Sequence, residues 1–379
     1  MANTAGTTGP RDLSSLVMLT GWDASALLNF KLIDGTTYAQ VASLLETAAQ
    51  GINAELANDT LWASLVTFTD QPQVEYRVGA STSMTRHTEY ARSNAERAAM
   101  EGHMLPLLAW EHMLGWTWDY LRRARMTQIQ ADIRNAAAAV RNRYRLALLT
   151  RLFKRTDDSG AVNGLGASGL SAGFATAAAS TGVDFVPPTV GGTSFDSNHE
   201  HYVGITGGAF TDAVFIDAKD ELREHGHDGP YEFLIGPSDE TTVRAISGFI
   251  PVASLANVQQ YATTVSIASL PGAADSNSGY YIGILRDFNI RVVRGIPQYY
   301  GVGYKSYGPR SALNPLAVRL FPGQSTPQVQ VMTNPAAGTG MLPLQEMMLF
   351  LEMGVGVNDR TAATPRYTNS ATWADPTIT

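Results

Sequence analysis

The chain has 379 residues and a formal net charge of −7, with 44% hydrophobic residues, only 16% charged residues and no cysteine. Because soluble domains usually have about a quarter of their residues charged, we expect part of this surface to face something other than water. The composition excludes disulfides, thiolate metal sites and a cysteine nucleophile, and no uncharged apolar run approaches the roughly 18 residues that span a bilayer.

The charges are unevenly distributed along the chain. Residues 84–155 contain 13 basic and 6 acidic residues, a net charge of +7, which leaves −14 for the remainder. The negative total argues against a simple DNA-coating protein. Residues 1–10 have neither the basic nor the apolar region of a secretory signal, so we expect a protein made in the cytoplasm without a membrane partner.

The first predicted elements are an arm and a hairpin. Residues 1–60 begin with a tail of small residues and contain one helical pattern, which starts at Tyr38. From 61 to 80 the pattern has period two, and Val74, Tyr76 and Val78 alternate with polar residues after a turn at 70–72. We predict a hairpin over 61–80 that buries little by itself and lies on a neighbour.

A long helix follows. After Pro106 the chain runs to Phe153 with one glycine and no further proline. Apolar residues recur every three or four positions on one helical face, namely Met126, Ile129, Ile133, Ala136, Val140, Tyr144 and Leu148. Residues 116–153 alone would extend about 55 Å at 1.5 Å per residue, so we predict a spine along which other elements pack.

The second half of the chain is expected to be rich in strands. Residues 156–205 are dominated by glycine, serine, alanine and threonine and predict a long loop. The elements expected after it are a helix at 211–225 closed by Gly226, a buried strand at 232–237, a helix at 238–248 and several strands after Gly279. The predicted fold class is α+β.

Two glycine-rich motifs suggest enzymes but lack the context that the chemistry needs. Gly169-Leu-Ser171-Ala-Gly173 matches the nucleophile elbow of serine hydrolases, and residues 164–169 match a dinucleotide fingerprint. Both require a buried strand directly before them, whereas residues 158–168 form a glycine-rich stretch. We therefore predict no catalytic and no cofactor-binding residue.

Four of the seven histidines form two close pairs, His199-Glu-His201 and His225-Gly-His227. Imidazoles are ordinary zinc or iron ligands, and alternate residues of a strand point the same way, so each pair could chelate. The second pair ends a predicted helix, where the dipole favours histidine, and the first borders a loop. We expect no bound metal, and metal binding by these histidines is left open as the alternative.

Arginines gather on the predicted long helix, at positions 122, 123, 125, 134, 141, 143, 145 and 151. A solvated face opposite the apolar face explains each of them singly. As a group they predict diffuse contact with phosphates, because guanidinium groups bind backbone charge without reading sequence. No nucleic-acid-binding motif accompanies them.

The order of these elements resembles the major capsid proteins of tailed bacteriophages, which have the Hong Kong 97-type fold. The similar pieces are residues 74–78, the helix to Phe153, and residues 233–238, 314–322 and 354–360. The resemblance implies an α+β fold with an N-terminal arm (1–60), an extended hairpin or E-loop with a following helix (61–100), a P-domain spine helix and glycine-rich loop (101–205), a strand-rich A-domain (206–340), and returning P-domain strands with a C-terminal tail (341–379).

The same resemblance implies a non-enzymatic protein that self-assembles, as hexamers and pentamers, into the icosahedral capsid of a virion around double-stranded DNA. Val74, Tyr76 and Val78 would then contact an adjacent subunit. The arginines expected to face packaged DNA, without sequence specificity, are Arg122, Arg123, Arg125, Arg141, Arg143 and Arg145. The other partners it implies are a portal, a separate scaffolding protein and, as an option, a decoration protein.

One property of some family members is not expected. These members cross-link an E-loop lysine to a neighbour's asparagine, but the four lysines here are Lys31, Lys154, Lys219 and Lys305, and none lies in the hairpin. The alternatives are an encapsulin-like nanocompartment shell and, from a different class, a metal-dependent or serine hydrolase.

Overall fold

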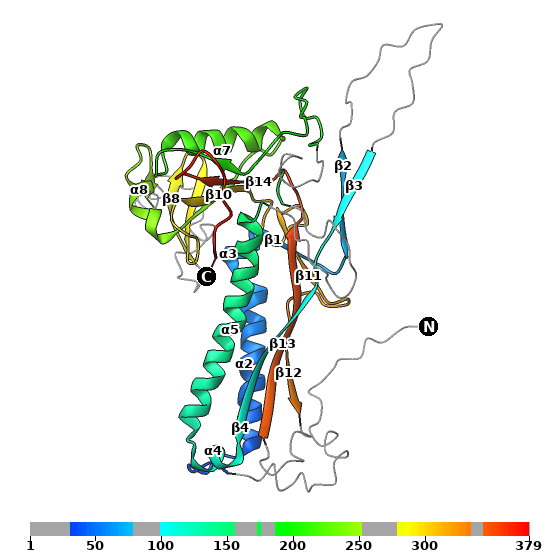
Figure 1. Cartoon of the computed structure of the whole chain (residues 1–379), viewed down its shortest axis with the longest axis vertical. Helices are drawn as coiled ribbons and strands as arrows, with labels where there is room; N and C mark the ends of the chain where they lie inside the picture. The colour runs from blue at the N-terminus through cyan, green and yellow to red at the C-terminus, as the bar shows by residue number, and fades with distance from the viewer. Residues whose placement is uncertain are drawn as a thin grey trace, which may run out of the picture. The chain divides into compact units, whose positions relative to one another are not determined.

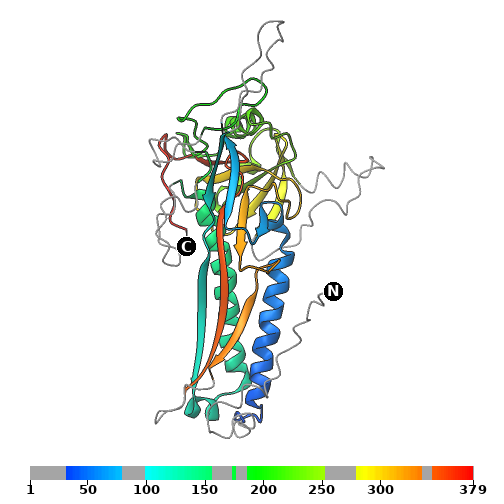
Figure 2. The same cartoon turned by 90° about the vertical axis from the view of Figure 1, so that its right-hand side faces the viewer.

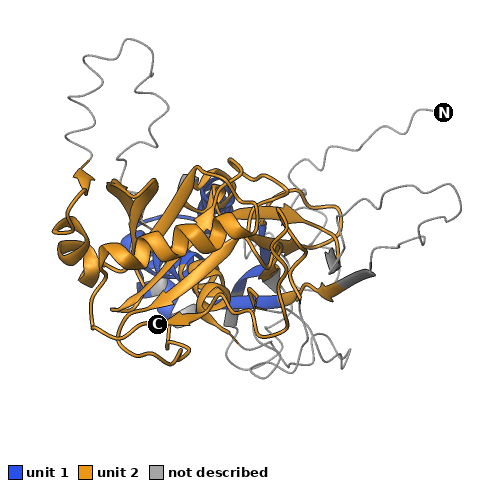
Figure 3. Cartoon of the chain, turned by 90° about the horizontal axis from the view of Figure 1, so that it is seen from above, with its two compact units in different colours: residues 1–55, 109–141, 328–351 blue, residues 56–108, 142–327, 352–379 orange. Residues whose placement is uncertain are grey.

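The computed structural model describes residues 31–78, 99–155, 173–175, 186–251, 279–334 and 344–378. They form a mixed α+β protein, which confirms the predicted fold class. The chain divides into two compact units (Figure 3). Unit 1 comprises residues 1–55, 109–141 and 328–351, and unit 2 comprises residues 56–108, 142–327 and 352–379.

The helices are α2 (Tyr38–Asn58), α3 (Thr60–Ala63), α4 (Trp118–Arg123), α5 (Met126–Phe153), α7 (Asp212–Glu224) and α8 (Glu240–Arg244), with a 3-10 turn η2 (Pro237–Asp239). The strands are β1 (Val66–Thr69), β2 (Gln73–Val78), β3 (Ala99–Met104), β4 (Leu108–Thr117), β5 (Val203–Gly204), β6 (Tyr231–Ile235), β7 (Ile250–Pro251), β8 (Gly279–Leu285), β9 (Phe288–Val293), β10 (Tyr300–Lys305), β11 (Leu316–Leu320), β12 (Val329–Asn334), β13 (Leu344–Val357) and β14 (Ala363–Tyr367). None of the described helices is long and apolar enough to cross a membrane.

Unit 1 combines parts of two long helices with long strands (Figures 1 and 2). The first part of β13 pairs antiparallel with β12, and β4 also pairs with β13. Asn53 of α2 holds the start of β12, because its side chain accepts from the Val329 N–H at 2.7 Å and donates to the Val329 carbonyl at 3.2 Å. Glu55 of α2 forms an ion pair with Arg141 of α5 at 2.7 Å.

The predicted long helix is confirmed only from Met126 onward. Its apolar positions from Ile129 to Leu148 are buried, as the three-and-four spacing predicts. The prediction of a helix is wrong for Leu108–Thr117, which form the strand β4. Their side chains are alternately more and less exposed. Leu108, Trp110, Leu114 and Trp116 all lie at even positions of the strand, and this alternation is the local signal of a strand.

The predicted hairpin has a different partner strand. Residues 73–78 are extended as expected, but β2 pairs antiparallel with the later strand β3, with Val74 opposite His103. The residues before the turn form β1, which pairs in parallel with β11, with Val66 opposite Leu316. Because Val66 is fully buried in unit 2, residues 66–69 cannot serve as half of an exposed hairpin.

Unit 2 is built on a seven-stranded sheet in the order β5-β14-β10-β6-β9-β8-β7. Helix α7 lies across one face of it (Figure 1), where Phe215 and Leu222 join a buried cluster with Phe233 and Phe288 of the sheet. All five residues of the central strand β6 are buried. The predicted helix is confirmed, and Gly226 after its end has φ +78, a conformation that favours glycine.

Several predictions fall on residues outside the described ranges. These are the N-terminal arm up to residue 30, residues 79–98 between β2 and β3, and most of the glycine-rich loop, with Ser171 of the hydrolase-like motif.

Candidate functional site

The predicted subunit contact lies in the two-stranded sheet of β2 and β3. Val74, Tyr76 and Val78 occupy alternate positions of β2, and this sheet is separate from the other sheets of the described chain. The strands approach closely at Gly102, where a Cβ would lie 2.6 Å from the Val74 carbonyl oxygen.

His103 fixes the end of β3 within unit 2. Its Nε2 lies 2.7 Å from the carbonyl oxygen of Val357, which can only accept, so the ring nitrogen donates. Burial lowers the pKa of His103 to about 4, and the imidazole is therefore neutral at neutral pH.

The candidate DNA-facing arginines fall into three environments. Arg123 at the end of α4 and Arg125 before α5 are exposed. Arg141 is held by Glu55. Arg143 and Arg145 are half-buried, and burial lowers the pKa of Arg143. Arg122 lies in α4.

Local capping explains why the exposed pair lies where it does. The chain turns between α4 and α5, and the first amides of α5 need acceptors outside the helix. The Asp34 carboxylate accepts from the Met126 N–H at 2.7 Å, and the Gln128 side chain accepts from the Arg125 N–H at 2.9 Å. This fixed turn presents Arg123 and Arg125 to solvent at the start of the helix.

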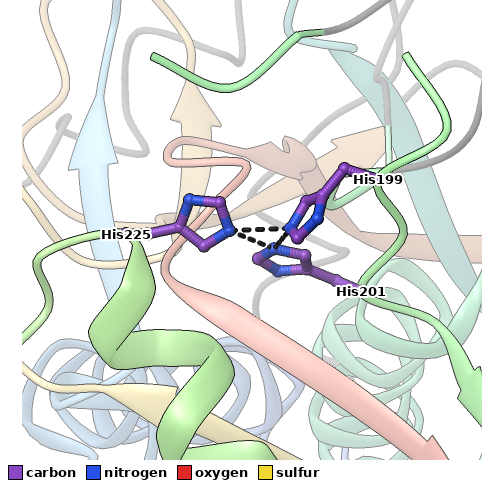
Figure 4. Close-up of side chains that lie close together, drawn as sticks. All are labelled: His199, His201 and His225. Atoms are coloured by element: carbon purple, nitrogen blue, oxygen red, sulfur yellow. Dashed lines mark hydrogen bonds between the residues drawn. The ribbon is translucent and has the colours of Figure 1, made fainter. Parts of the chain in front are cut away.

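Three of the four predicted histidines meet in unit 2, which we call the histidine cluster: His199, His201 and His225 (Figure 4). The Nε2 of His225 lies 2.8 Å from that of His199 and 2.9 Å from that of His201, and the remaining pair is 3.1 Å apart. His199 and His201 come from the segment before β5, and His225 caps the end of α7.

Burial makes the histidine cluster a set of neutral imidazoles. It lowers the pKa of His225 to about 3, lowers that of His201 well below its ordinary value, and lowers that of His199 as well. His201 is fully buried, and its Nδ1 lies 2.8 Å from the Ala363 carbonyl oxygen, so this nitrogen donates and Nε2 bears a lone pair.

His227 is not part of the cluster. Its Nδ1 lies 2.7 Å from the Tyr307 hydroxyl, and its Nε2 lies 2.9 Å from the Thr361 hydroxyl. The chain reverses at Gly226 after α7, which directs the next side chain into a different environment.

Sequence reasoning missed the residues around the histidine cluster. Glu221 and Glu224 lie in the last turns of α7, and Glu221 is four residues before His225, on the same helical face. Burial raises the pKa of Glu221 to about 7, against the opposing effect of the buried Arg366 guanidinium that contacts it. Phe195 stacks on His225 with ring centroids 4.3 Å apart. The helical spacing of the two glutamates was the available signal.

No family model and no curated protein matches the chain. Among solved structures, a chain of Mycobacterium phage Patience is similar with a TM-score of 0.62 and 18% identity, over 99% of this chain and 97% of that chain. Chains from the capsid of an empty GTA particle (TM-score 0.46, 14% identity, 82% and 96% covered) and from the mature capsid of bacteriophage PhiM1 (0.45, 11%, 81% and 86%) are more distantly similar. The chain shares the fold of the Mycobacterium phage Patience chain over nearly its whole length, and the predicted resemblance is confirmed at the level of the fold.

Proposed function

We propose that this protein is a major capsid protein that self-assembles into the icosahedral shell of a virion and encloses double-stranded DNA. The observation that carries the proposal is the fold shared over 99% of this chain and 97% of a phage chain. The low charged fraction of 16% supports the same function, because shell subunits cover one another's surfaces.

Individual elements of the fold have proposed places in the Hong Kong 97-type plan. We assign β2 and β3 to the E-loop that lies on an adjacent subunit, and α5 to the spine of the P-domain, with β13 beside it. The seven-stranded sheet with α7 would form the A-domain. The separate two-stranded sheet supports this assignment, because a pair of strands is only marginally stable by itself and is expected to gain stability on a neighbour.

Self-assembly is tested by the size of the purified protein. Chromatography and negative-stain microscopy should show hollow particles in the megadalton range, whereas a stable monomer or dimer would overturn the proposal. The double variant Tyr76→Ser, Val78→Ser should assemble into far fewer shells than wild type. The control Gln73→Ser, Glu75→Gln changes the alternate positions of the same strand and should assemble normally.

DNA enclosure is tested at the arginines of α4 and of the turn before α5. In the triple variant Arg122→Gln, Arg123→Gln, Arg125→Gln we expect shells to form but to retain less DNA, with the deficit largest at low salt, because fewer phosphate contacts make the binding less dependent on salt. A control with the same charge change, Arg223→Gln, Arg244→Gln, Arg294→Gln, uses exposed arginines of unit 2 and should package normally. Equal amounts of packaged DNA in both variants would contradict the assignment of these arginines to DNA contact.

The encapsulin-like alternative makes a different prediction for the contents of the shell. Particles that hold a protein cargo and no DNA would favour it over a genome container. No observation in the described residues favours a hydrolase, since a solved structure that matches over 99% of the chain is a phage chain and Ser171 lies outside the described residues.

We further propose that the shell forms without lysine cross-links in the E-loop. No lysine occurs between residues 73 and 104. Lys219 binds Asp287 at 3.0 Å, and Lys305 donates to the backbone carbonyls of Asp228 and Gly229. Denaturing electrophoresis of purified shells should show the monomer, and a ladder of multimers would contradict this.

A further inference from the structure

We propose that the histidine cluster of His199, His201 and His225 binds one Zn²⁺ ion through the three Nε2 atoms. This inference concerns the interior of unit 2 and does not rest on the proposed shell function. It develops the alternative that the sequence left open, namely metal binding by these histidines.

Hydrogen bonding alone cannot account for the geometry of the cluster. An imidazole Nε2 either bears a hydrogen and donates or bears a lone pair and accepts, never both. All three pairs of Nε2 atoms are 2.8 to 3.1 Å apart, so each pair would need one donor and one acceptor. Among three atoms with two possible states, at least two are alike. One of the three contacts is therefore repulsive unless a cation lies among the lone pairs.

His201 is already oriented as a metal ligand. Its Nδ1 donates to the Ala363 carbonyl of β14, which leaves the Nε2 lone pair directed at the other two rings. Ligating histidines almost always make such a hydrogen bond with their second nitrogen, since it fixes the tautomer and the ring orientation. Figure 4 shows the three rings converging on one point.

The dimensions fit a small tetrahedral ion. Zn–N bonds of about 2.0–2.1 Å imply Nε2 atoms about 3.3 Å apart, so the rings need to separate by only a few tenths of an ångström. Imidazole nitrogens suit zinc, and a chain without cysteine offers no thiolate alternative.

Glu224 is placed to supply the fourth ligand. Its Oε1 lies 3.5 Å from the Nε2 of His199 and 3.8 Å from that of His225. The other nearby carboxylate, Glu221, is held by its Oε2, which contacts Arg366 and accepts from the Thr364 hydroxyl at 2.9 Å, and its Oε1 lies farther from the cluster, 3.9 Å from the Nε2 of His201. With all four positions filled by the protein, the ion would be structural and not catalytic. It would join the segment before β5 to the end of α7.

The test measures zinc in untagged full-length protein by elemental analysis after dialysis. Wild type should hold about one Zn²⁺ per chain, and a chelator should remove it and lower the unfolding midpoint. His199→Gln and His225→Gln should bind zinc more than about 100-fold more weakly, a larger loss than outer-shell changes cause. The control His227→Gln removes a buried histidine beside the cluster and should keep the full stoichiometry.

Cobalt provides a second measurement that needs no variant. Co²⁺ added to the chelator-treated wild-type chain should give the intense visible absorption of a tetrahedral site, and added Zn²⁺ should abolish it. Folded wild-type protein with no stoichiometric zinc and no tetrahedral cobalt spectrum would overturn the proposal. Equal zinc affinity in His199→Gln and wild type would also overturn it. Shell formation is scored separately, so failure of the metal site and failure of assembly are distinguishable.

Discussion

Asn314 offers the sharpest test of how unit 2 is held together. Its side chain is fully buried, and Nδ2 lies 3.0 Å from the Gly308 carbonyl, 3.1 Å from that of Ala63 and 3.3 Å from that of Val66. Its Oδ1 accepts from the Tyr307 N–H at 3.1 Å. One amide thus joins the loop before β11 to the start of β1, about 250 residues earlier in the chain.

The change Asn314→Asp keeps the shape and reverses the polarity of the group that faces these carbonyls. The Nδ2 amide has two hydrogens, so two good hydrogen bonds of about 1 to 1.5 kcal/mol each are lost, and the new carboxyl oxygen is buried against carbonyl oxygens. We therefore expect the free energy of unfolding to fall by about 3–5 kcal/mol. The unfolding entropy of about 2.1 cal/mol/K per residue converts this, over 379 residues, into a midpoint lower by about 4–6 °C.

Scanning calorimetry at neutral pH measures this midpoint. The matched control Asn135→Asp makes the same chemical change at an exposed position of α5 and should stay within about 0.5 kcal/mol of wild type. A midpoint for Asn314→Asp within 1 °C of the control would refute the reasoning, because it would show that the three carbonyls do not depend on this donor.

Two further predictions concern stability. Gly354→Ala should lower the unfolding midpoint by the equivalent of about 3 kcal/mol, because the new Cβ would lie 1.9 Å from the Pro106 carbonyl oxygen. Gly51→Ala in α2 meets nothing within 4 Å and should raise the free energy of unfolding by about 0.5–1 kcal/mol. Thermal scans that show the opposite order of midpoints would contradict both expectations. Burial raises the pKa of Asp239 from 3.8 to about 6, against the hydrogen bond from the Tyr299 N–H, so the folded chain holds a proton that the unfolded chain releases. The associated stability is present below pH 3.8 and is lost as the pH rises through 6, by at most about 3 kcal/mol. Asp239→Asn should therefore match wild type near pH 4 and exceed it above pH 6 in denaturant titrations, and a variant that is less stable at pH 7.5 would argue against a buried charge.

Local signals in the sequence were sufficient where neighbours along the chain decide the structure. The capping pattern around α7 and the apolar spacing from Ile129 to Leu148 predicted helices that the structure contains. Residues 108–117 are wrong as a predicted helix, because the absence of proline permits a helix but does not require one, whereas Leu108, Trp110, Leu114 and Trp116 all lie at even positions, as in a strand. The alternation itself is a local signal and could have corrected the prediction.

Strand partners are decided by contacts that no local pattern reports. Val66 pairs with Leu316, and Val74 pairs with His103 and not with the residues just before the turn. Periodicity shows that a segment is extended and which face is apolar, but pairing depends on which distant strand completes the burial.

The same distinction between local signals and contacts of distant segments applies to the candidate sites. The sequence by itself determined the α+β class, the absence of thiols, the lack of lysine between residues 73 and 104 and the presence of paired histidines near residues 200 and 226. Only the tertiary structure decided that His199, His201 and His225 share one centre while His227 faces Tyr307 and Thr361. The physical reason is that the cluster forms where the end of α7, the segment before β5 and the start of β14 pack together. That convergence depends on the burial of the whole sheet and not on the spacing of histidines along the chain.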